Sequence, residues 1–162
     1  MSTLFDDPSE RVEDHLQPDQ ERLAAMHRGA NWFYWIAGLS LVNSAIFAFG
    51  GQVSFILGLS YTQVIDVFSD AIVAGGGPAF FRWLAIAFDI GIVLFFALVG
   101  YYANKAFKTA FLIGIAVYGV DALLWLLFGG WLEIAFHVYA LIWIVKGFMA
   151  SRSLGQLDTK NI

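Results

Sequence analysis

Four apolar stretches, each long enough to cross a lipid bilayer, constrain this chain more than any other feature of its sequence. A hydrocarbon layer about 30 Å thick is crossed by about 20 residues of α-helix, which satisfies its own backbone hydrogen bonds. The stretches cover approximately residues 31–50, 79–103, 107–128 and 131–150. The sequence therefore predicts an all-α membrane protein, a bundle of four transmembrane helices.

Composition supports a membrane location. The 162 residues are 59% hydrophobic and 14% charged, and the mean hydropathy is +0.70, whereas soluble domains have about 25% charged residues. The chain has no cysteine, which excludes disulfides and thiolate metal sites. A chain of this length has room for one domain.

The distribution of lysine and arginine predicts the orientation, because these residues accumulate in short loops on the cytoplasmic side. The basic residues of that side are Arg11, Arg22, Arg28, Lys105, Lys108, Lys146, Arg152 and Lys160. We therefore expect both termini in the cytoplasm of a multi-pass protein of the plasma or inner membrane. The transmembrane domain is residues 29–150, and residues 151–162 form a cytoplasmic tail.

Residues 1–28 form an acidic cytoplasmic segment. Its acidic residues outnumber its basic ones and are Asp6, Asp7, Glu10, Glu13, Asp14, Asp19 and Glu21. An acidic segment argues against binding to nucleic acid, which requires a basic patch. The segment is either a disordered tail or a pair of short helices around 8–16 and 19–28.

The segment between the first two stretches predicts a short amphipathic helix over residues 60–74, outside the cytoplasm. Ser60 and Gln63 resemble a capping box at its start. Its apolar residues recur at helical spacing opposite a polar face that includes Asp66 and Asp70. We expect this helix to lie on the outer surface as a cap, with Asp66 or Asp70 pairing with Arg82.

Each predicted span carries polar residues that are costly in lipid and therefore tend to face the bundle interior. They are Asn43, Asp89, Asp121, Glu133 and His137. Helical spacing places them on stripes expected to face inward. These stripes are Ile36, Ser40, Asn43 and Phe47; Ala85, Asp89, Phe96 and Gly100; Gly114, Tyr118, Asp121 and Trp125; and Glu133, His137, Ala140, Ile144 and Gly147. If all four stripes meet, one polar cluster forms in the outer half of the bundle.

Three interpretations of this cluster remain open. Asp121, Glu133 and His137 are suitable ligands for a divalent metal such as Zn²⁺ or Mn²⁺. The same groups, partly desolvated, are candidates for a proton relay. Alternatively, the polar side chains serve as hydrogen-bonding contacts between helices.

These interpretations lead to three hypotheses of function. The first is a protein that binds or moves a cation, proton or small polar solute through the polar cluster, in a homo-oligomer because one small bundle can hardly enclose an aqueous path. The second is an accessory or scaffold subunit without catalytic activity in a larger membrane complex. The third is a membrane-embedded metal-dependent hydrolase. The sequence has no nucleotide-binding loop or hydrolase signature, and a single histidine within the spans argues against haem.

Overall fold

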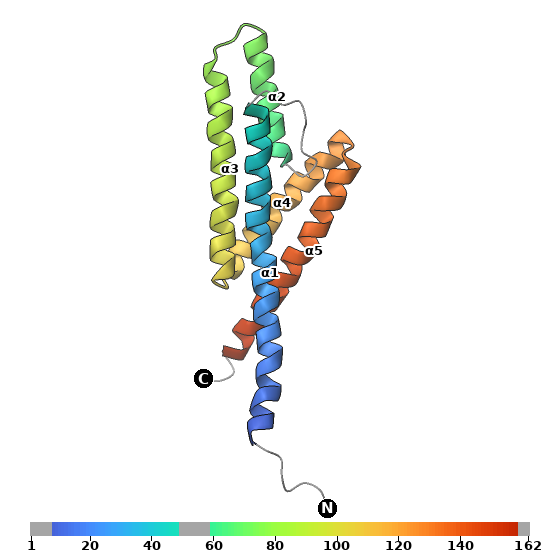
Figure 1. The fold of residues 1–162 in the computed structure, drawn as a ribbon. Coiled ribbons are helices and arrows are strands. Elements are labelled where there is room, and N and C mark those ends of the chain that lie inside the picture. The colour runs from blue at the N-terminus through green and yellow to red at the C-terminus, as the bar shows by residue number, and fades with distance from the viewer. Residues whose placement is uncertain (1–7, 49–58, 159–162) are drawn as a thin grey trace, which may run out of the picture.

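A computed structural model describes residues 8–48 and 59–158, with side chains from 18 to 46 and from 59 to 154. All regular secondary structure in these ranges is helical. The helices are α1 (Pro8–Ala48), α2 (Ser60–Ala74), α3 (Phe80–Asn104), α4 (Lys108–Phe128) and α5 (Trp131–Asp158). In Figure 1, α1 begins and α5 ends at the same end of the molecule, opposite the turn between α2 and α3.

Within the described residues, three helices are long and apolar enough to cross a membrane: α3, α4 and the section Trp131–Leu154 of α5. Their starts lie within one residue of the predicted boundaries, and α5 continues past the predicted end at residue 150. These helices confirm an all-helical membrane protein. The count of four spans stays a prediction. The predicted stretch 31–50 contains several polar residues, and its last two residues lie outside the described ranges.

Helix α1 differs from the expected pair of short helices followed by a separate span. It runs without a break from Pro8 to Ala48 and passes through Pro18. Proline cannot donate the helical hydrogen bond, but Pro18 lies in the polar part of α1, where water can bind the freed carbonyl. The acidic residues Asp6 and Asp7 and the basic Lys160 lie outside the described residues.

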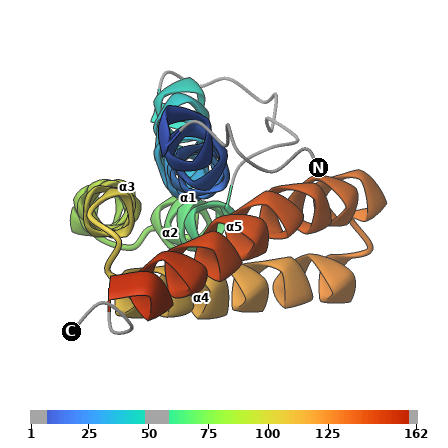
Figure 2. The same cartoon turned by 90° about the horizontal axis from the view of Figure 1, so that it is seen from below.

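The helices form two groups that cross each other. Helices α1, α2 and α3 run side by side, and α4 and α5 form a hairpin that crosses them obliquely (Figures 1 and 2). The hairpin turns at Gly129, which adopts φ 73° after the last residue of α4. Glycine tolerates this left-handed conformation, and the turn lies between the two stretches predicted at 107–128 and 131–150.

The apolar core lies where α1 meets α3, α4 and α5. Phe33 of α1 is fully buried, and its ring lies 6.4 Å from that of Phe96 and 6.0 Å from that of Phe111. A side chain at Gly114 of α4 would collide with the Phe33 ring. The glycine on the predicted inward stripe of α4 therefore leaves the space that Phe33 fills.

Helices α1 and α5 approach each other to backbone contact. A Cβ atom added to Gly29 would lie 2.6 Å from the Cα of Gly147. Small residues permit such crossings between helices in membranes. Gly147 belongs to the stripe of α5 predicted to allow close packing, and Ala140 and Ile144 of the same stripe are fully buried, which confirms that face.

A small polar cluster joins α1 to α3 near the α3–α4 link. The carboxamide oxygen of Asn104 lies 2.7 Å from Nδ1 of His27. The amide of Asn104 donates to Asn31 Oδ1 at 3.2 Å and to the Gly100 carbonyl at 3.0 Å. These contacts join the middle of α1 to the end of α3 that lies away from the α2–α3 turn.

Helix α2 is oriented opposite to the prediction. It runs beside α3 as the first arm of a helical hairpin (Figure 1) instead of lying across the ends of the bundle. Its buried residues are polar and are Ser60, Thr62, Asp66 and Ser69. Val67 and Phe68, by contrast, are each 64% exposed. The polar face therefore points into the protein and the apolar face points outward.

Candidate functional site

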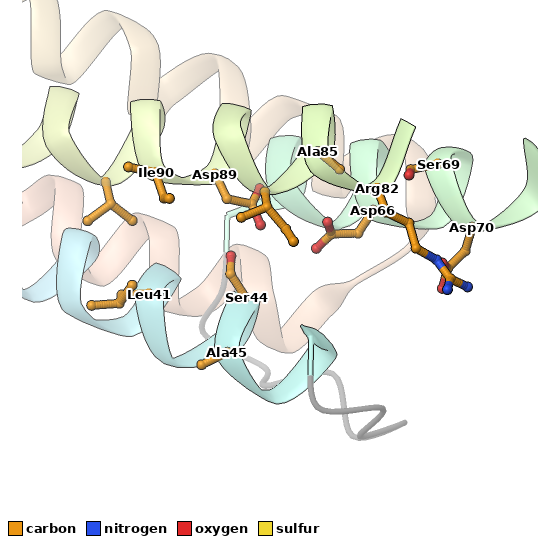
Figure 3. A pocket seen from close by; sticks show the side chains of 12 residues that line it. Leu41, Ser44, Ala45, Asp66, Ser69, Asp70, Arg82, Ala85, Asp89 and Ile90 are labelled. Carbon is orange, nitrogen blue, oxygen red and sulfur yellow. The ribbon is translucent and has the colours of Figure 1, made fainter. Parts of the chain in front are cut away.

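A pocket with a cavity of about 410 Å³ lies between α1, α2 and α3. Most of its wall is apolar, and its polar residues come mainly from α2 and α3. The lining residues are Leu41, Ser44, Ala45, Asp66, Ser69, Asp70, Arg82, Ala85, Ile86, Asp89, Ile90 and Val93. Figure 3 shows the order along the pocket, with Leu41 and Ile90 at one end, the carboxylates in the middle and Arg82 at the other end.

Two carboxylates from different helices face each other across this pocket. Asp66 comes from α2 and Asp89 from α3, and their side chains point toward one another in Figure 3. Each residue is 4% exposed. Buried carboxylates are rare unless they are paired with a positive charge or hydrogen-bonded. The arrangement therefore calls for a group that neutralises or bridges the two acids.

Several polar atoms in the pocket have no hydrogen-bond partner among the described residues. By distance and angle these atoms are Asp89 Oδ1, Ser44 Oγ and Ser69 Oγ, and the Ser44 hydroxyl still lies close enough to the Asp89 carboxylate to interact with it. A buried polar atom left unsatisfied costs about 1–3 kcal/mol, and more when it is charged. In a cavity with room for a small molecule, such atoms are available to bind a ligand that donates hydrogen bonds.

The end of the pocket away from Leu41 carries an ion pair. Arg82 Nε donates to Asp70 Oδ1 at 2.9 Å, and both side chains are substantially exposed. Arg82 therefore neutralises Asp70 at the rim and leaves Asp66 and Asp89 inside. Of the two partners considered for Arg82, the structure places Asp70 against it and turns Asp66 into the pocket.

Burial raises the pKa of Asp66 to about 7, with smaller contributions from the nearby carboxylates of Asp89 and Asp70. Asp66 lies on α2, which at 15 residues is too short to cross a bilayer. The charged groups around it are Asp89 and Arg82 from α3 and Asp70 from α2 itself, and α1 contributes the neutral Ser44 to the lining. Asp66 can therefore gain or lose a proton near neutral pH.

A second polar site joins the start of α2 to the α4–α5 hairpin. Asp121 of α4 is fully buried, and its Oδ2 accepts from the Ser60 backbone N–H at 3.1 Å. Its Oδ1 accepts from the Ser60 hydroxyl at 2.6 Å and from the Tyr61 backbone N–H at 3.1 Å. Asp121 thus supplies the helix cap for α2 from another helix.

This cap corrects the predicted capping box. Ser60 is the first residue of α2 rather than its N-cap, and the N-cap residue, Leu59, makes no capping bond through its side chain. The backbone N–H of Gln63 bonds to the Leu59 carbonyl at 3.4 Å and is not the target of the Ser60 hydroxyl. The carboxylate of Asp121 is a stronger acceptor than a serine hydroxyl, which explains why it takes the free N–H groups.

His137 of α5 completes the environment of Asp121. Its Nε2 lies 2.8 Å from Asp121 Oδ2, and its Nδ1 lies 2.7 Å from the Glu133 carbonyl oxygen. Because that carbonyl can only accept, Nδ1 donates to it, so both ring nitrogens of His137 have partners. The Tyr118 ring stacks on the imidazole at 4.5 Å and covers one of its faces.

The residues predicted to form one cluster are therefore distributed over separate places. Asp121 and His137 are bonded to each other, and Asp89 lies in the pocket with Asp66. Asn43 is buried on α1, and Glu133 contributes its backbone carbonyl to His137 while its carboxylate lies against Gly130.

The suggested metal ligands Asp121, Glu133 and His137 do not converge. Among the side chains that the structure describes, no three histidine, cysteine, aspartate or glutamate residues form a ligand set for a metal ion. Both oxygens of Asp121 already accept hydrogen bonds from Ser60, Tyr61 and His137. This geometry fits a structural contact between helices better than a metal centre.

Sequence reasoning missed Ser44 and Ser69 and assigned Asp66 to the surface. Thr62, Asp66 and Ser69 do recur at helical spacing, and this stripe was the signal that could have identified them. The stripe was interpreted as facing water, because most amphipathic helices expose their polar face.

Comparison with protein-family models, with curated proteins and with solved structures finds no match to this chain. The function of this chain is therefore inferred from its own geometry.

Proposed function

We propose that this chain is an integral membrane protein that binds a cation between Asp66 and Asp89 and exchanges it for a proton. The observation that carries the proposal is the pair of buried carboxylates that face each other across a cavity (Figure 3). Asp89 Oδ1 has no partner among the described residues, so the site offers an acceptor that the protein itself does not use.

Exchange follows from the electrostatics of two close carboxylates. In a medium of low dielectric constant, two neighbouring acids cannot both ionise without a compensating charge. A shared proton or a bound cation supplies that charge, and the two compete for the same oxygens. The pKa of Asp66, about 7, makes this competition effective near neutral pH.

The proposed orientation places both termini in the cytoplasm of the plasma or inner membrane. It is supported by cationic side chains near one end of the molecule that lie over aromatic rings. Lys105 Nζ is 4.4 Å from the Tyr101 ring centroid, and Lys146 Nζ is 4.9 Å from that of Trp143. Lysine and aromatic residues combine in this way at membrane interfaces. In this orientation the Asp66–Asp89 pocket belongs to the outer half.

Movement of the cation across the bilayer would require a homo-oligomer. A bundle of this size is too small to enclose a continuous aqueous path by itself, whereas several copies together could line one. The many exposed apolar side chains are consistent with lipid contact and do not by themselves favour the accessory-subunit hypothesis. Binding at the pocket is therefore the part of the proposal to test first.

The test is calorimetric titration of the full chain in lipid nanodiscs with Na⁺, K⁺ and methylammonium. Each titration is done in two buffers with different ionisation enthalpies, which counts the protons released. We expect at least one of these cations to bind and to displace a proton at pH 7. Asp89→Asn should weaken that binding at least tenfold.

Glu133→Gln is the matched control, because it also replaces an acid by an amide within a predicted span but lies outside the pocket. It should bind as the wild type does. If none of the three cations binds, or if Asp89→Asn and Glu133→Gln bind as the wild type does, the proposal is wrong.

A further inference from the structure

We infer that the ligand of the pocket is an organic ammonium ion with an apolar body, a class more specific than cations in general. This inference rests on the proposed function, since it names the substrate class of the same site. It comes from the walls of the cavity and from the kinds of oxygen atom available within it.

The pocket has a chemical gradient along its length. Asp66 and Asp89 lie in the middle, and Leu41 and Ile90 lie at the end away from Arg82 (Figure 3). Val93 adds to the apolar lining. A ligand with a charged head and an apolar body fits this order, with its ammonium group between the carboxylates and its body against Leu41 and Ile90.

The oxygen atoms of the pocket suit an ammonium group better than a bare metal ion. Hard cations such as Ca²⁺ take about six to eight oxygen ligands, and Mg²⁺ takes about six. The polar lining here consists of a few carboxylate and hydroxyl oxygens, several without partners. An ammonium group has up to three N–H groups that donate hydrogen bonds. Asp89 Oδ1, the Asp66 carboxylate and Ser44 Oγ can accept these bonds.

The size of the cavity sets an upper limit on the ligand. At about 410 Å³, it lies near the lower end of the range of small-molecule pockets, roughly 300–1,000 Å³. A single aromatic ring with an aminomethyl group fits within such a space. Each methylene that leaves water on binding strengthens affinity on the order of fourfold, so an apolar body should contribute strongly.

The experiment compares three probes with the full chain in nanodiscs: methylammonium, benzylammonium and the neutral benzyl alcohol. Empty nanodiscs correct for partition into lipid. We expect benzylammonium to bind at least tenfold more tightly than methylammonium, and benzyl alcohol to bind at least tenfold more weakly than benzylammonium. Asp89→Asn should remove most of the difference between the charged and the neutral ring compound.

Two variants fill the apolar end of the pocket. Ile90→Trp does so from α3 and Ala45→Phe from α1, and both positions are exposed enough to accept a larger side chain. Each variant should bind benzylammonium no more tightly than methylammonium. Its affinity for methylammonium should stay within about threefold of that of the wild type. Leu94→Trp is the control, because Leu94 is exposed on α3 and does not line the pocket.

The outcomes separate the two proposals. The inference about the apolar body is wrong if the wild type binds methylammonium and benzylammonium with equal affinity. It is also wrong if benzylammonium still binds more tightly than methylammonium in both Ile90→Trp and Ala45→Phe. Cation binding that still depends on Asp89 would then leave the proposed function standing. If no cation binds in an Asp89-dependent manner, both are wrong.

Discussion

The two buried acidic sites of this protein differ in how completely their hydrogen bonds are satisfied. Asp121 receives bonds from Ser60, Tyr61 and His137, whereas Asp89 lies in a cavity with an oxygen that has no partner among the described residues. A saturated carboxylate fixes helices relative to each other, and an unsatisfied one is available to a ligand. Hydrogen-bond saturation therefore distinguishes these two acids, and it is the ground on which we assign binding to Asp89 and a structural role to Asp121.

The largest effect on stability is expected from Asp121→Ala. The substitution leaves His137 and two backbone N–H groups of α2 buried without their acceptor, and breaking such a pair costs about 3–5 kcal/mol. Thermal or denaturant unfolding in mild detergent measures the loss. Asp121→Asn keeps one acceptor oxygen and should lose less, and a loss below about 1 kcal/mol for Asp121→Ala would contradict the structural role.

A pair of serine substitutions tests the same contrast more gently. Ser60→Ala removes a hydroxyl that donates to Asp121 at 2.6 Å and should cost about 1.5–3 kcal/mol, as for other bonds to charged groups. Ser69→Ala removes a buried hydroxyl that has no partner among the described residues and should be neutral or slightly stabilising. Equal losses in the two variants would remove the distinction between the sites.

The pH dependence of stability should reveal Asp66. Its pKa of about 7 in the folded protein exceeds the ordinary value of 3.8. Between pH 4 and pH 7, Asp66 is therefore protonated in the folded state and ionised in the unfolded state. Stability is then highest below about pH 4, falls as the pH rises and levels off above about pH 7. Asp66→Asn should reduce this slope by on the order of 1 kcal/mol per pH unit, as measured by unfolding at pH 4, 6 and 8. An unchanged slope would mean that Asp66 is ionised in the folded protein.

No loss of stability is expected from Asp89→Asn. Because Asp89 Oδ1 has no partner among the described residues, the neutral amide should leave the free energy of unfolding unchanged or raise it. Cation binding should nevertheless fall at least tenfold. A loss of stability comparable to that of Asp121→Ala would show that Asp89 also holds helices together.

Much of the fold could be predicted because lipid fixes the length of a crossing helix and the helical period fixes its faces. Gly114, Ala140 and Gly147 were predicted to face inward, and they do. The period of one helix does not show which helix lies opposite, however. Asp89 and Asp121 therefore looked like members of one cluster, although Asp89 meets α2 within the pocket and Asp121 meets His137.

Helix α2 shows a second limit of periodicity. The sequence distinguishes a polar face with Thr62, Asp66 and Ser69 from an apolar face with Val64 and Phe68. It does not indicate which face meets the protein, because that depends on whether the medium around the helix is water or lipid. The structure turns the polar face inward, and this orientation places Asp66 and Ser69 in the lining of the pocket.

The contact between Gly29 and Gly147 has a mechanical consequence for the pocket. With no side chain between them, α1 and α5 approach each other most closely at these two glycines, near the middle of α1. Ser44 lies fifteen residues farther along α1, about 22 Å at 1.5 Å per residue. A change of about 5° in the crossing angle would therefore displace Ser44 by about 2 Å, enough to make or break a hydrogen bond to a ligand held by Asp89.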